Sequence, residues 1–515
     1  MILGDPKAAG AQAGSRTTLD ALFRHAAERR PDAIAIADPP NRATFTDGPP
    51  RRLSYAEADR LVTAIANRLV RLGLATDSVV GVQLPNTAEG VLTLLGVMRA
   101  GMIPALMPLL WRRADAVQAL GRTGAKAIIA SSRVGSFDHC DLAMHLAANL
   151  FGIRHVCGFG TKLADGVVPL DDLFLMEPSA LAPDILREGN PAAHVAAITF
   201  EITPHGLIAV PRDHLQLISG GLAVLLEGRI GVETSILACC SLNSFAGLAH
   251  TVMPWLMTGG LLSLHHAFDP RAFLAQCGVE RCSTVILPGA MVRQMADAGL
   301  LAHADLKSVL AVWPAPERLA LGAAWRHDSA ALIDVQVFGE TALIAARREA
   351  EGLPEAIAYG TVQAPRGSAG AVTVAETART EAGTFAVRGP MVPSHAFPPG
   401  VERSGAAHFH TDDAGFVDTG YGCRIDDDAG TLTLTGPPAG MVNVGGYRFR
   451  QRELVDQVKT ADIDATIGAL PDAILGHRLS GNAADSPDVE ATLSAMGANP
   501  LITGAFRGRP VLDAA

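Results

Sequence analysis

The stretch Asp413-Ala-Gly-Phe-Val-Asp-Thr-Gly-Tyr-Gly-Cys-Arg-Ile-Asp-Asp-Asp-Ala-Gly-Thr-Leu-Thr-Leu-Thr-Gly436, continued by Met441-Val-Asn-Val-Gly-Gly-Tyr-Arg-Phe-Arg-Gln-Arg-Glu453, decides the fold. It contains a short β-like run between glycine and aspartate turns, and similar runs lie at 370–374 and 383–387. These runs predict a small β-rich subdomain over about 355–435. The segment 436–440, Gly-Pro-Pro-Ala-Gly, is typical of a hinge, and residues 441–515 are expected to form a short α+β domain.

Upstream of this stretch, helical and strand patterns alternate. Ser54-Tyr-Ala-Glu57 predicts a capping box at the start of a helix that ends near Gly73. The further elements expected are a strand at 78–84, a helix at 86–101 and strands at 126–130, 259–264 and 283–288. Such alternation predicts a mostly parallel sheet covered by helices. We therefore expect two α/β subdomains, at about 18–190 and 195–335, after an N-terminal tail at 1–17.

The composition narrows the class of protein. With 49% hydrophobic and 18% charged residues, the chain is expected to be compact, and its net charge of −10 argues against a nucleic-acid partner. The seven cysteines form no C-x-x-C pair, which favours reduced thiols over disulfides or zinc. Arg99 and Gly101 interrupt the apolar stretch 91–111, so a helix and a strand are expected there, with no membrane span. The start of the sequence shows no signal-peptide pattern, so we expect a cytoplasmic protein.

In their order and spacing, these segments resemble the adenylate-forming (AMP-binding) superfamily, which includes acyl- and aryl-CoA synthetases. The resemblance runs from about Thr18 to about Arg478, and its supporting blocks are 97–104, 338–342 and 387–390. It implies the family's α/β fold, with a large domain at 18–435, a hinge at 436–440 and a shortened C-terminal domain at 441–515. Members join a carboxylate to ATP, and usually pass the acyl group to CoA or to a carrier-protein thiol.

The family's phosphate-binding loop corresponds to Phe200–Ala209, and this segment departs from it. A phosphate loop needs glycines, hydroxyl groups and a lysine. The lysine position holds Ile208, while Glu201 and Pro204 are poor neighbours for a triphosphate and Thr203 is the one hydroxyl that remains. The sequence therefore predicts a rebuilt loop at 198–214.

The other nucleotide contacts implied by the resemblance are also altered. Ala342 stands where a glutamate helps to hold magnesium, and Glu340 could replace it only if its side chain faced the same way, as in an extended segment. Tyr421 and Pro437 replace the two ribose contacts, and Ala439 and Gly440 replace the charged hinge residue. No lysine follows Lys459 to supply the late catalytic lysine. The family-matched cofactor positions are Phe338, Gly339, Thr341, Gly420, Gly445 and Gly446.

The magnitudes argue for weak or absent adenylation. A hydrogen bond to a charged group contributes about 1.5–3 kcal/mol. The loss of one preorganised transition-state donor costs roughly 10²–10³ in rate. ATP and magnesium are expected of the family, but their ligands are missing here; CoA or acyl-CoA remains compatible.

Several residues allow two interpretations. Glu201 is either a new catalytic acid or a carboxylate that faces solvent or pairs with an arginine, and His205 is either a general base or a neutral loop histidine. His408, His410 and Asp412 would share one face of a strand, which raises a metal hypothesis, but no metal site is assigned.

Two further segments are ambiguous. Trp313, Pro314 and Ala315 are expected at the substrate pocket, where Trp313 either fills the adenine pocket or shapes a new one. Gly445 and Gly446 either lie on the pantetheine path or form a turn that needs positive φ.

Three functions follow. The favoured one is an acyl-CoA synthetase-like protein of fatty-acid or carboxylate metabolism that has lost adenylation, a pseudoenzyme. It would bind an acyl group, an acyl thioester, or a partner such as a carrier protein or another enzyme. The second is an active ATP-dependent carboxylate–CoA ligase with unusual residues. The third is an enzyme with new chemistry at the loop 198–214, with Glu201 and His205 as its candidates.

Overall fold

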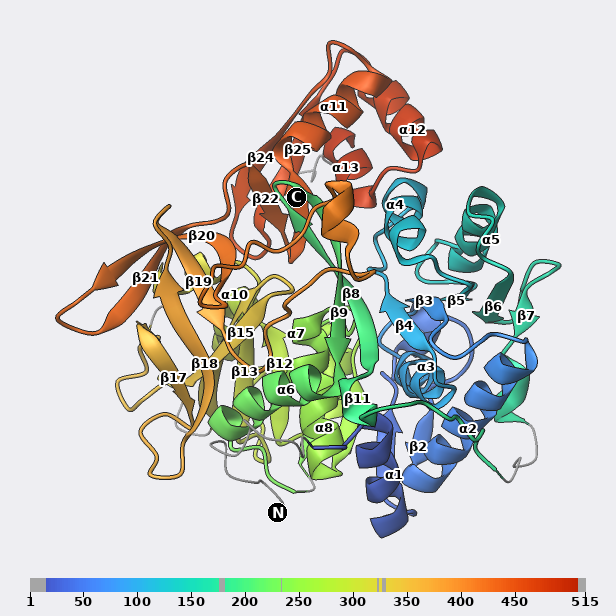
Figure 1. The fold of residues 1–515 in the computed structure, drawn as a ribbon, viewed down its shortest axis with the longest axis horizontal. Helices are drawn as coiled ribbons and strands as arrows, with labels where there is room; N and C mark the ends of the chain where they lie inside the picture. The colour runs from blue at the N-terminus through green and yellow to red at the C-terminus, as the bar shows by residue number, and fades with distance from the viewer. Residues whose placement is uncertain (1–14, 176–180, 233, 322–323, 327–329, 508–515) are drawn as a thin grey trace, which may run out of the picture.

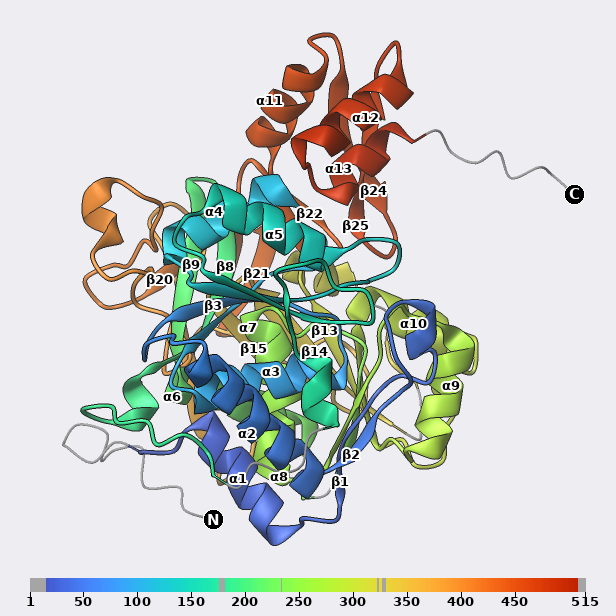
Figure 2. The ribbon, with the colours of Figure 1, turned by 90° about the vertical axis from the view of Figure 1, so that its right-hand side faces the viewer.

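The computed structural model describes residues 15–175, 181–232, 234–321, 324–326 and 330–507. Figures 1 and 2 show a large body with the C-terminal residues stacked on one end of it. Four sheets, two of them mixed and two antiparallel, together with the packed helices confirm the expected α/β fold class. Most of the N-terminal tail expected at 1–17 lies outside the described residues.

One sheet has seven strands, in the order β7-β6-β5-β3-β4-β8-β9. All its pairs are parallel except β8–β9, and strands such as β3 are buried on both faces, as a parallel sheet between helices requires. Its strands are β3 (Val79–Gln83), β4 (Ile103–Leu106), β5 (Ala127–Ser131), β6 (His155–Phe159), β7 (Val168–Pro169), β8 (Val195–Thr203) and β9 (Gly206–Asp213). The helices between them are α3 (Ala88–Arg99), α4 (Arg113–Thr123) and α5 (His139–Asn149).

A second sheet has eight strands, in the order β15-β14-β13-β12-β10-β11-β1-β2. They are β1 (Ile34–Ala37), β2 (Arg52–Ser54), β10 (Ser235–Ala238), β11 (Leu261–Leu264), β12 (Thr284–Pro288), β13 (Ser308–Trp313), β14 (Ala331–Phe338) and β15 (Ala342–Arg347). The accompanying helices are α1 (Leu19–Arg29), α2 (Tyr55–Arg71), α6 (His214–Gly228), α7 (Phe245–Gly247), the π-helix η5 (Leu248–Val252), α8 (Met253–Thr258), α9 (Pro270–Val279) and α10 (Gly289–Asp297).

The two α/β sheets exchange chain segments. β1 and β2 join the eight-stranded sheet, because β1 pairs with β11. β8 and β9 join the seven-stranded sheet, because β8 pairs with β4. The sheets therefore do not follow the expected ranges 18–190 and 195–335. Hydrophobic patterns locate strands, but they carry no information on which sheet a strand joins.

The remaining two sheets are antiparallel. The six-stranded one contains β16 (Ile357–Ala358), β17 (Gly360–Ala364), β18 (Val372–Arg379), β19 (Thr384–Arg388), β20 (Val417–Asp426) and β21 (Thr431–Gly436). The C-terminal domain contains β22 (Met441–Val444), β23 (Tyr447–Arg450), β24 (Thr466–Asp472) and β25 (Gly476–Asn482), with α11 (Gln451–Ala461), α12 (Ser486–Met496) and α13 (Pro500–Thr503). This domain encloses a small core of its own.

Local sequence signals placed two helices correctly. The capping box at Ser54 and Glu57 is present at the start of α2. The apolar stretch 91–111 forms the body of α3 followed by β4. Within the described residues, no helix is both long and apolar enough to cross a membrane.

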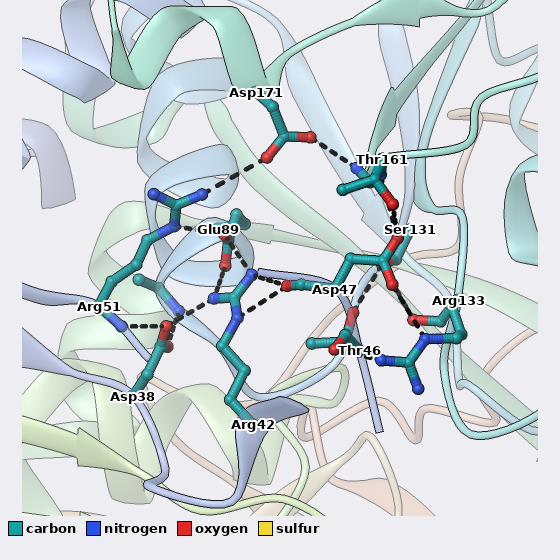
Figure 3. Close-up of polar contacts among 12 residues, drawn as sticks. Asp38, Arg42, Thr46, Asp47, Arg51, Glu89, Ser131, Arg133, Thr161 and Asp171 are labelled. Atoms are coloured by element: carbon teal, nitrogen blue, oxygen red, sulfur yellow. Dashed lines mark hydrogen bonds and ion pairs between the residues drawn. The ribbon is translucent and has the colours of Figure 1, made fainter. Parts of the chain in front are cut away.

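A buried polar network joins the segment around β1 and β2 to the start of α3 (Figure 3). The Arg42 guanidinium donates to Asp38 at 2.5 Å and to Glu89 at 2.7 and 2.8 Å, and Arg51 donates to Glu89 at 2.8 Å. Burial and the charge of Glu89 raise the pKa of Asp38 to about 6. Burial opposes ionisation of Glu89 too, but the hydrogen bond and charge of Arg42 outweigh it and lower the pKa of Glu89 to about 2. The network therefore holds ionised Glu89 between two arginines.

Candidate functional site

The segment expected to be a rebuilt loop at 198–214 is a β-hairpin. β8 and β9 pair in register from Ile198–Pro211 to Thr203–Gly206, so only Pro204 and His205 form the turn. The Thr203 hydroxyl donates to the carbonyl of Gly206 at 3.0 Å and accepts from the amide of His205 at 3.2 Å. The one hydroxyl that remained for a phosphate is thus used inside the turn.

Glu201 pairs with an arginine of the C-terminal domain. It lies on β8 with 4% of its surface exposed, and its carboxylate forms an ion pair with Arg448 on β23. The same carboxylate accepts from the backbone amide of Glu340. Of the two interpretations of Glu201, the structure therefore shows the paired carboxylate, which joins three segments that are distant in the sequence.

Tyr421 completes this cluster. It lies on β20, is fully buried, and its hydroxyl accepts from Arg448 Nη2 at 2.6 Å and donates to the carbonyl of Pro314 at 3.4 Å. Burial raises the pKa of Tyr421 to about 12, so the hydroxyl stays protonated at neutral pH. Its ring meets Phe338 edge-on, with centroids 5.6 Å apart. We call Glu201, Arg448 and Tyr421 the interdomain cluster.

Of the family-matched positions next to this cluster, Gly339 and Thr341 lie in a turn and Gly420 lies within β20. Gly339 has φ of +58°, and a Cβ on it would lie 2.1 Å from Glu201 Oε2. Thr341 donates its amide to the carbonyl of Phe338 at 3.1 Å within the same turn. Gly420 has φ of +75°, and a Cβ there would approach Pro438 to 3.2 Å. The glycine at 339 makes room for the Glu201 carboxylate at the place where the resemblance puts a nucleotide contact.

Glu340 does not occupy the position of a magnesium ligand on a strand. Residues 339–341 form the turn between β14 and β15, so the extended segment on which its substitution depended is absent. Its carboxylate accepts from the amide of Phe245, at the start of α7, at 2.8 Å. Burial, followed by the charge of Glu201, raises the pKa of Glu340 to about 7. A carboxyl group that is partly protonated at neutral pH is a weak cation ligand.

A cavity of about 460 Å³ lies between the large domain and the C-terminal domain; we call it the interdomain cavity. Apolar walls come from Trp111, Phe200, Leu207, Val312 and Val337, among others. The interdomain cluster contributes Glu201 and Arg448 to one side of it. The large domain and the C-terminal domain thus enclose a space of ligand size.

Trp313 is a wall of this cavity. Its indole donates to Asp334 at 2.9 Å, and Asp334 is paired with Arg348 at 2.6 Å. Gly289 allows this position, because a Cβ on it would lie 2.3 Å from the Trp313 ring. Pro314 and Ala315 also line the cavity. The Trp313 side chain therefore forms part of the cavity wall and does not fill the cavity.

The sequence signals missed His250. This residue is 1% exposed on the π-helix η5, faces the interdomain cavity, and lies 2.8 Å from Thr251 Oγ1 through Nδ1. Burial lowers its pKa to about 3, so the imidazole is neutral. π-helical turns are frequent at functional sites but have no sequence signature that would have pointed to His250.

The neighbouring cysteines Cys239 and Cys240 also line the cavity. Burial raises the pKa of Cys240 to about 12 and that of Cys239 well above its ordinary value. Both thiols are therefore protonated, and this part of the wall is uncharged.

Gly445 and Gly446 form the turn between β22 and β23. Their φ values are +57° and +94°, as a two-residue hairpin turn requires. Both also line the interdomain cavity. Gly445 and Gly446 therefore form a turn that needs positive φ and also lie on the wall of the cavity.

The histidines of the metal hypothesis do not lie on a strand. His408 and His410 are in irregular chain, with ring centroids 5.3 Å apart, and His205 lies 5.2 Å from His410. In the part of the chain that the structure describes, no group of three or more His, Cys, Asp or Glu side chains could hold a metal ion. His205 is exposed at the hairpin turn and does not line the cavity. The structure therefore does not bring His205 and Glu201 together as an acid–base pair.

Comparisons with known proteins agree on one family. Residues 23–156, about a quarter of the chain, match the family model described as AMP-binding enzyme. The chain is 26% identical over 487 residues to the 2-hydroxy-7-methoxy-5-methyl-1-naphthoate–CoA ligase of Streptomyces carzinostaticus, covering 90% of this chain and 83% of the relative. It is 23% identical to the medium-chain fatty-acid–CoA ligase of Escherichia coli, covering 88% and 79%.

Solved structures share the fold. The amide bond synthetase McbA from Marinactinospora thermotolerans has a TM-score of 0.68 at 17% identity, covering 94% of both chains. The apo structure of Mycobacterium smegmatis MbtA has a TM-score of 0.64 at 21% identity, covering 95% of this chain and 90% of that one.

Proposed function

We propose that this chain, which belongs to the adenylate-forming superfamily and is acyl-CoA synthetase-like, has lost adenylation and binds an acyl group, an acyl thioester or a carrier-protein partner in its interdomain cavity. The observation that carries this proposal is the ion pair between Glu201 and Arg448. It lies against Gly339, at the position where the resemblance places a nucleotide contact.

The interdomain cluster opposes a nucleotide in two ways. First, phosphates would have to approach the carboxylate of Glu201, and like charges repel at short range. Second, to move Arg448 aside would leave Glu201 buried without its partner, which costs about 3–5 kcal/mol. Tyr421 adds a buried ring at the position of a ribose contact. Each effect weakens the binding of ATP without touching the apolar walls.

The cavity itself supports a binding role. Its volume of about 460 Å³ lies within the range of small-molecule sites, and its walls are mostly apolar. Burial of an acyl chain or an aromatic ring needs no charged group. Relatives named as CoA ligases of naphthoate and of medium-chain fatty acids suggest acyl or aryl ligands of this kind.

The competing function is an ATP-dependent carboxylate–CoA ligase in which Glu340 binds magnesium. The names of the relatives favour it. The engagement of the Glu340 carboxylate with the amide of Phe245 disfavours it, as does the raised pKa of Glu340. The separation of Glu201 from His205 gives no support to new acid–base chemistry at the hairpin.

Equilibrium binding of ATP–magnesium, CoA and acyl-CoAs, followed by pyrophosphate exchange over a panel of carboxylic acids, tests the proposal. We expect binding of at least one acyl-CoA, no saturable binding of ATP–magnesium, and no exchange above background. An active CoA ligase in the same assay serves as the positive control. Robust exchange would overturn the proposal, whereas acyl-CoA binding without ATP binding would exclude the ligase.

A matched pair of variants locates the bound acyl-CoA. Ala246 lines the cavity and is 5% exposed, so Ala246→Phe is expected to reduce the affinity at least tenfold. Ala298 is exposed beyond the end of α10 and does not line the cavity, so Ala298→Phe is expected to leave the affinity for acyl-CoA unchanged. Equal effects of the two substitutions would place the ligand elsewhere.

A further inference from the structure

Two of the three arginines that line the interdomain cavity are paired with a carboxylate, and the third donates to backbone carbonyls. Arg448 pairs with Glu201, and Arg450 pairs with Glu453 on α11. Arg318 donates to the carbonyls of Asp472 and Ala473 at 3.3 and 2.9 Å. Among the described residues that line the cavity there is no lysine. A carboxylate ligand would therefore meet guanidinium groups that already have a protein partner, although the buried Arg450 Nε has none among the described residues.

The acidic residues of the wall indicate the same preference. Burial raises the pKa of Glu340 to about 7 and that of Asp115 to about 6. Both groups line the cavity, so their own ionisation is disfavoured there. The neutral imidazole of His250 and the protonated thiols of Cys239 and Cys240 add no positive charge. The surroundings of the cavity are thus unfavourable for an anion.

One feature would attract an anion. The first residues of α10, Gly289 and Ala290, line the cavity, and Pro288 provides no side-chain cap. The start of a helix carries a partial positive charge, but its contribution is much smaller than the cost of burying a carboxylate without a counter-ion. The amides at this helix start can also donate to the oxygen of an uncharged carbonyl group.

A buried amide side chain offers a further contact. Asn443, on β22, lines the cavity and is 6% exposed. Neither its carboxamide oxygen nor its amide nitrogen has a hydrogen-bond partner among the residues that the structure describes. Buried polar atoms nearly always have a partner, and a ligand amide, which offers both an N–H and a C=O, would satisfy both atoms.

We propose that the interdomain cavity selects an uncharged acyl group carried as a thioester on an amide-containing arm, and rejects the free carboxylic acid. This inference rests on the proposed function, because it assumes that the cavity binds acyl ligands. It reverses the charge preference expected of an enzyme whose substrate is a carboxylate.

Binding of three matched probes to the full chain tests the inference. Benzoate, methyl benzoate and benzoyl-N-acetylcysteamine share one ring, and octanoate with its two derivatives forms a second series. At pH 8 we expect the thioester in at least one series to bind at least tenfold more tightly than the acid, or about 1.4 kcal/mol. Equal or tighter binding of the acid, or no binding of any probe, would overturn the inference.

Two variants assign the preference to named groups. Glu201→Gln removes the partner of Arg448, so it is expected to raise the affinity for the acid at least fivefold and to change that for the thioester less than twofold. Asn443→Leu is expected to weaken the amide-containing thioester at least fivefold and to leave the methyl ester unchanged. If Glu201→Gln does not fold, the affinities of the wild type for the acid and the thioester, together with those of Asn443→Leu, still test the inference. Unchanged affinities in both variants would contradict the assignment.

The outcomes separate the inference from the proposed function. Robust pyrophosphate exchange together with a preference for the thioester would refute the proposed function alone. Absent exchange with a preference for the free acid would refute the inference alone. Tryptophan fluorescence reports the location of the probe. Trp111 and Trp313 both line the cavity, so Trp313→Phe should reduce the signal change without abolishing it, while Trp325→Phe, outside the cavity, should leave it intact.

Discussion

At the scale of single residues, two neighbouring glutamates differ because of their partners. Glu201 has Arg448 as its counter-ion, whereas Glu340 has the amide of Phe245 and no cation in a hydrogen bond among the described residues. Burial therefore dominates at Glu340 and raises its pKa from 4.5 to about 7. A carboxyl group in this state binds a proton more tightly in the folded chain than in the unfolded chain.

This difference makes stability depend on pH. Between pH 4.5 and 7 the folded state holds a proton on Glu340 that the unfolded state has released, so stability from this group is complete below pH 4.5 and is lost as pH rises through 7. Glu340→Gln mimics the protonated form and lacks this dependence. As pH rises from 4.5 to 8, we expect the free energy of unfolding of the variant to increase relative to that of the wild type by on the order of 3 kcal/mol. Urea denaturation at several pH values measures this; parallel curves would contradict the assignment.

At the scale of elements, the packing of α2 against α3 depends on one small residue. Gly96 on α3 faces Ile65 on α2, and a Cβ on Gly96 would lie 2.6 Å from Ile65 Cγ2 and 3.3 Å from the carbonyl of Val62. The absence of a side chain therefore sets how closely the two helices approach. These helices enclose part of the main hydrophobic core.

Gly96→Ala is expected to destabilise the protein by about 1–3 kcal/mol, because the added methyl group forces the helices apart. Gly121→Ala on α4 is the matched control. A Cβ there meets only Leu150, at 3.7 Å, and the better helix propensity of alanine should stabilise by up to about 1 kcal/mol. Thermal or urea unfolding compares the two; the same sign for both would contradict the packing argument.

At the scale of the whole molecule, the interdomain cluster holds the C-terminal domain on the large domain. Arg448 is 247 residues away from Glu201 in the sequence. The contact is supported by the Tyr447 hydroxyl, which accepts from the amide of Leu110 at 3.4 Å, and by the Ala114 amide, which donates to Gly497 at 3.1 Å. A buried ion pair specifies this arrangement more than it stabilises it.

Arg448→Met is expected to destabilise by about 3–5 kcal/mol, because it leaves the Glu201 carboxylate buried and unpaired. The double variant Glu201→Leu/Arg448→Met should recover most of that loss, since it removes both charges. Arg452→Met is the control. Because Arg452 is exposed on α11, this substitution should change the free energy of unfolding by no more than about 0.5 kcal/mol. Urea denaturation measures all three; a double variant that is no more stable than Arg448→Met would contradict the coupling of the pair.

Features that depend on interactions between residues close in the sequence were predictable, and features that depend on distant residues were not. The capping box of α2, the strands near 79–83 and 284–288 and the β-rich part all appeared where expected, because propensities and hydrophobic periodicity act over a few residues. The segment 198–214 was expected to be a loop, because the resemblance places a phosphate-binding loop there, whereas β8 and β9 pair instead. Arg448 and His250 were missed because their roles depend on residues far away in the sequence.

The sequence by itself determined the superfamily and the α/β fold class, and it predicted the loss of residue types that a nucleotide site needs. These properties lie in local patterns and in the identity of single side chains. Only the tertiary structure decided which sheet each strand joins, that Glu201 meets Arg448, that Glu340 turns toward α7, and that Trp313 bounds an open cavity. The physical reason is that pairing, burial and pKa depend on which distant atoms share a volume, and no local pattern records that.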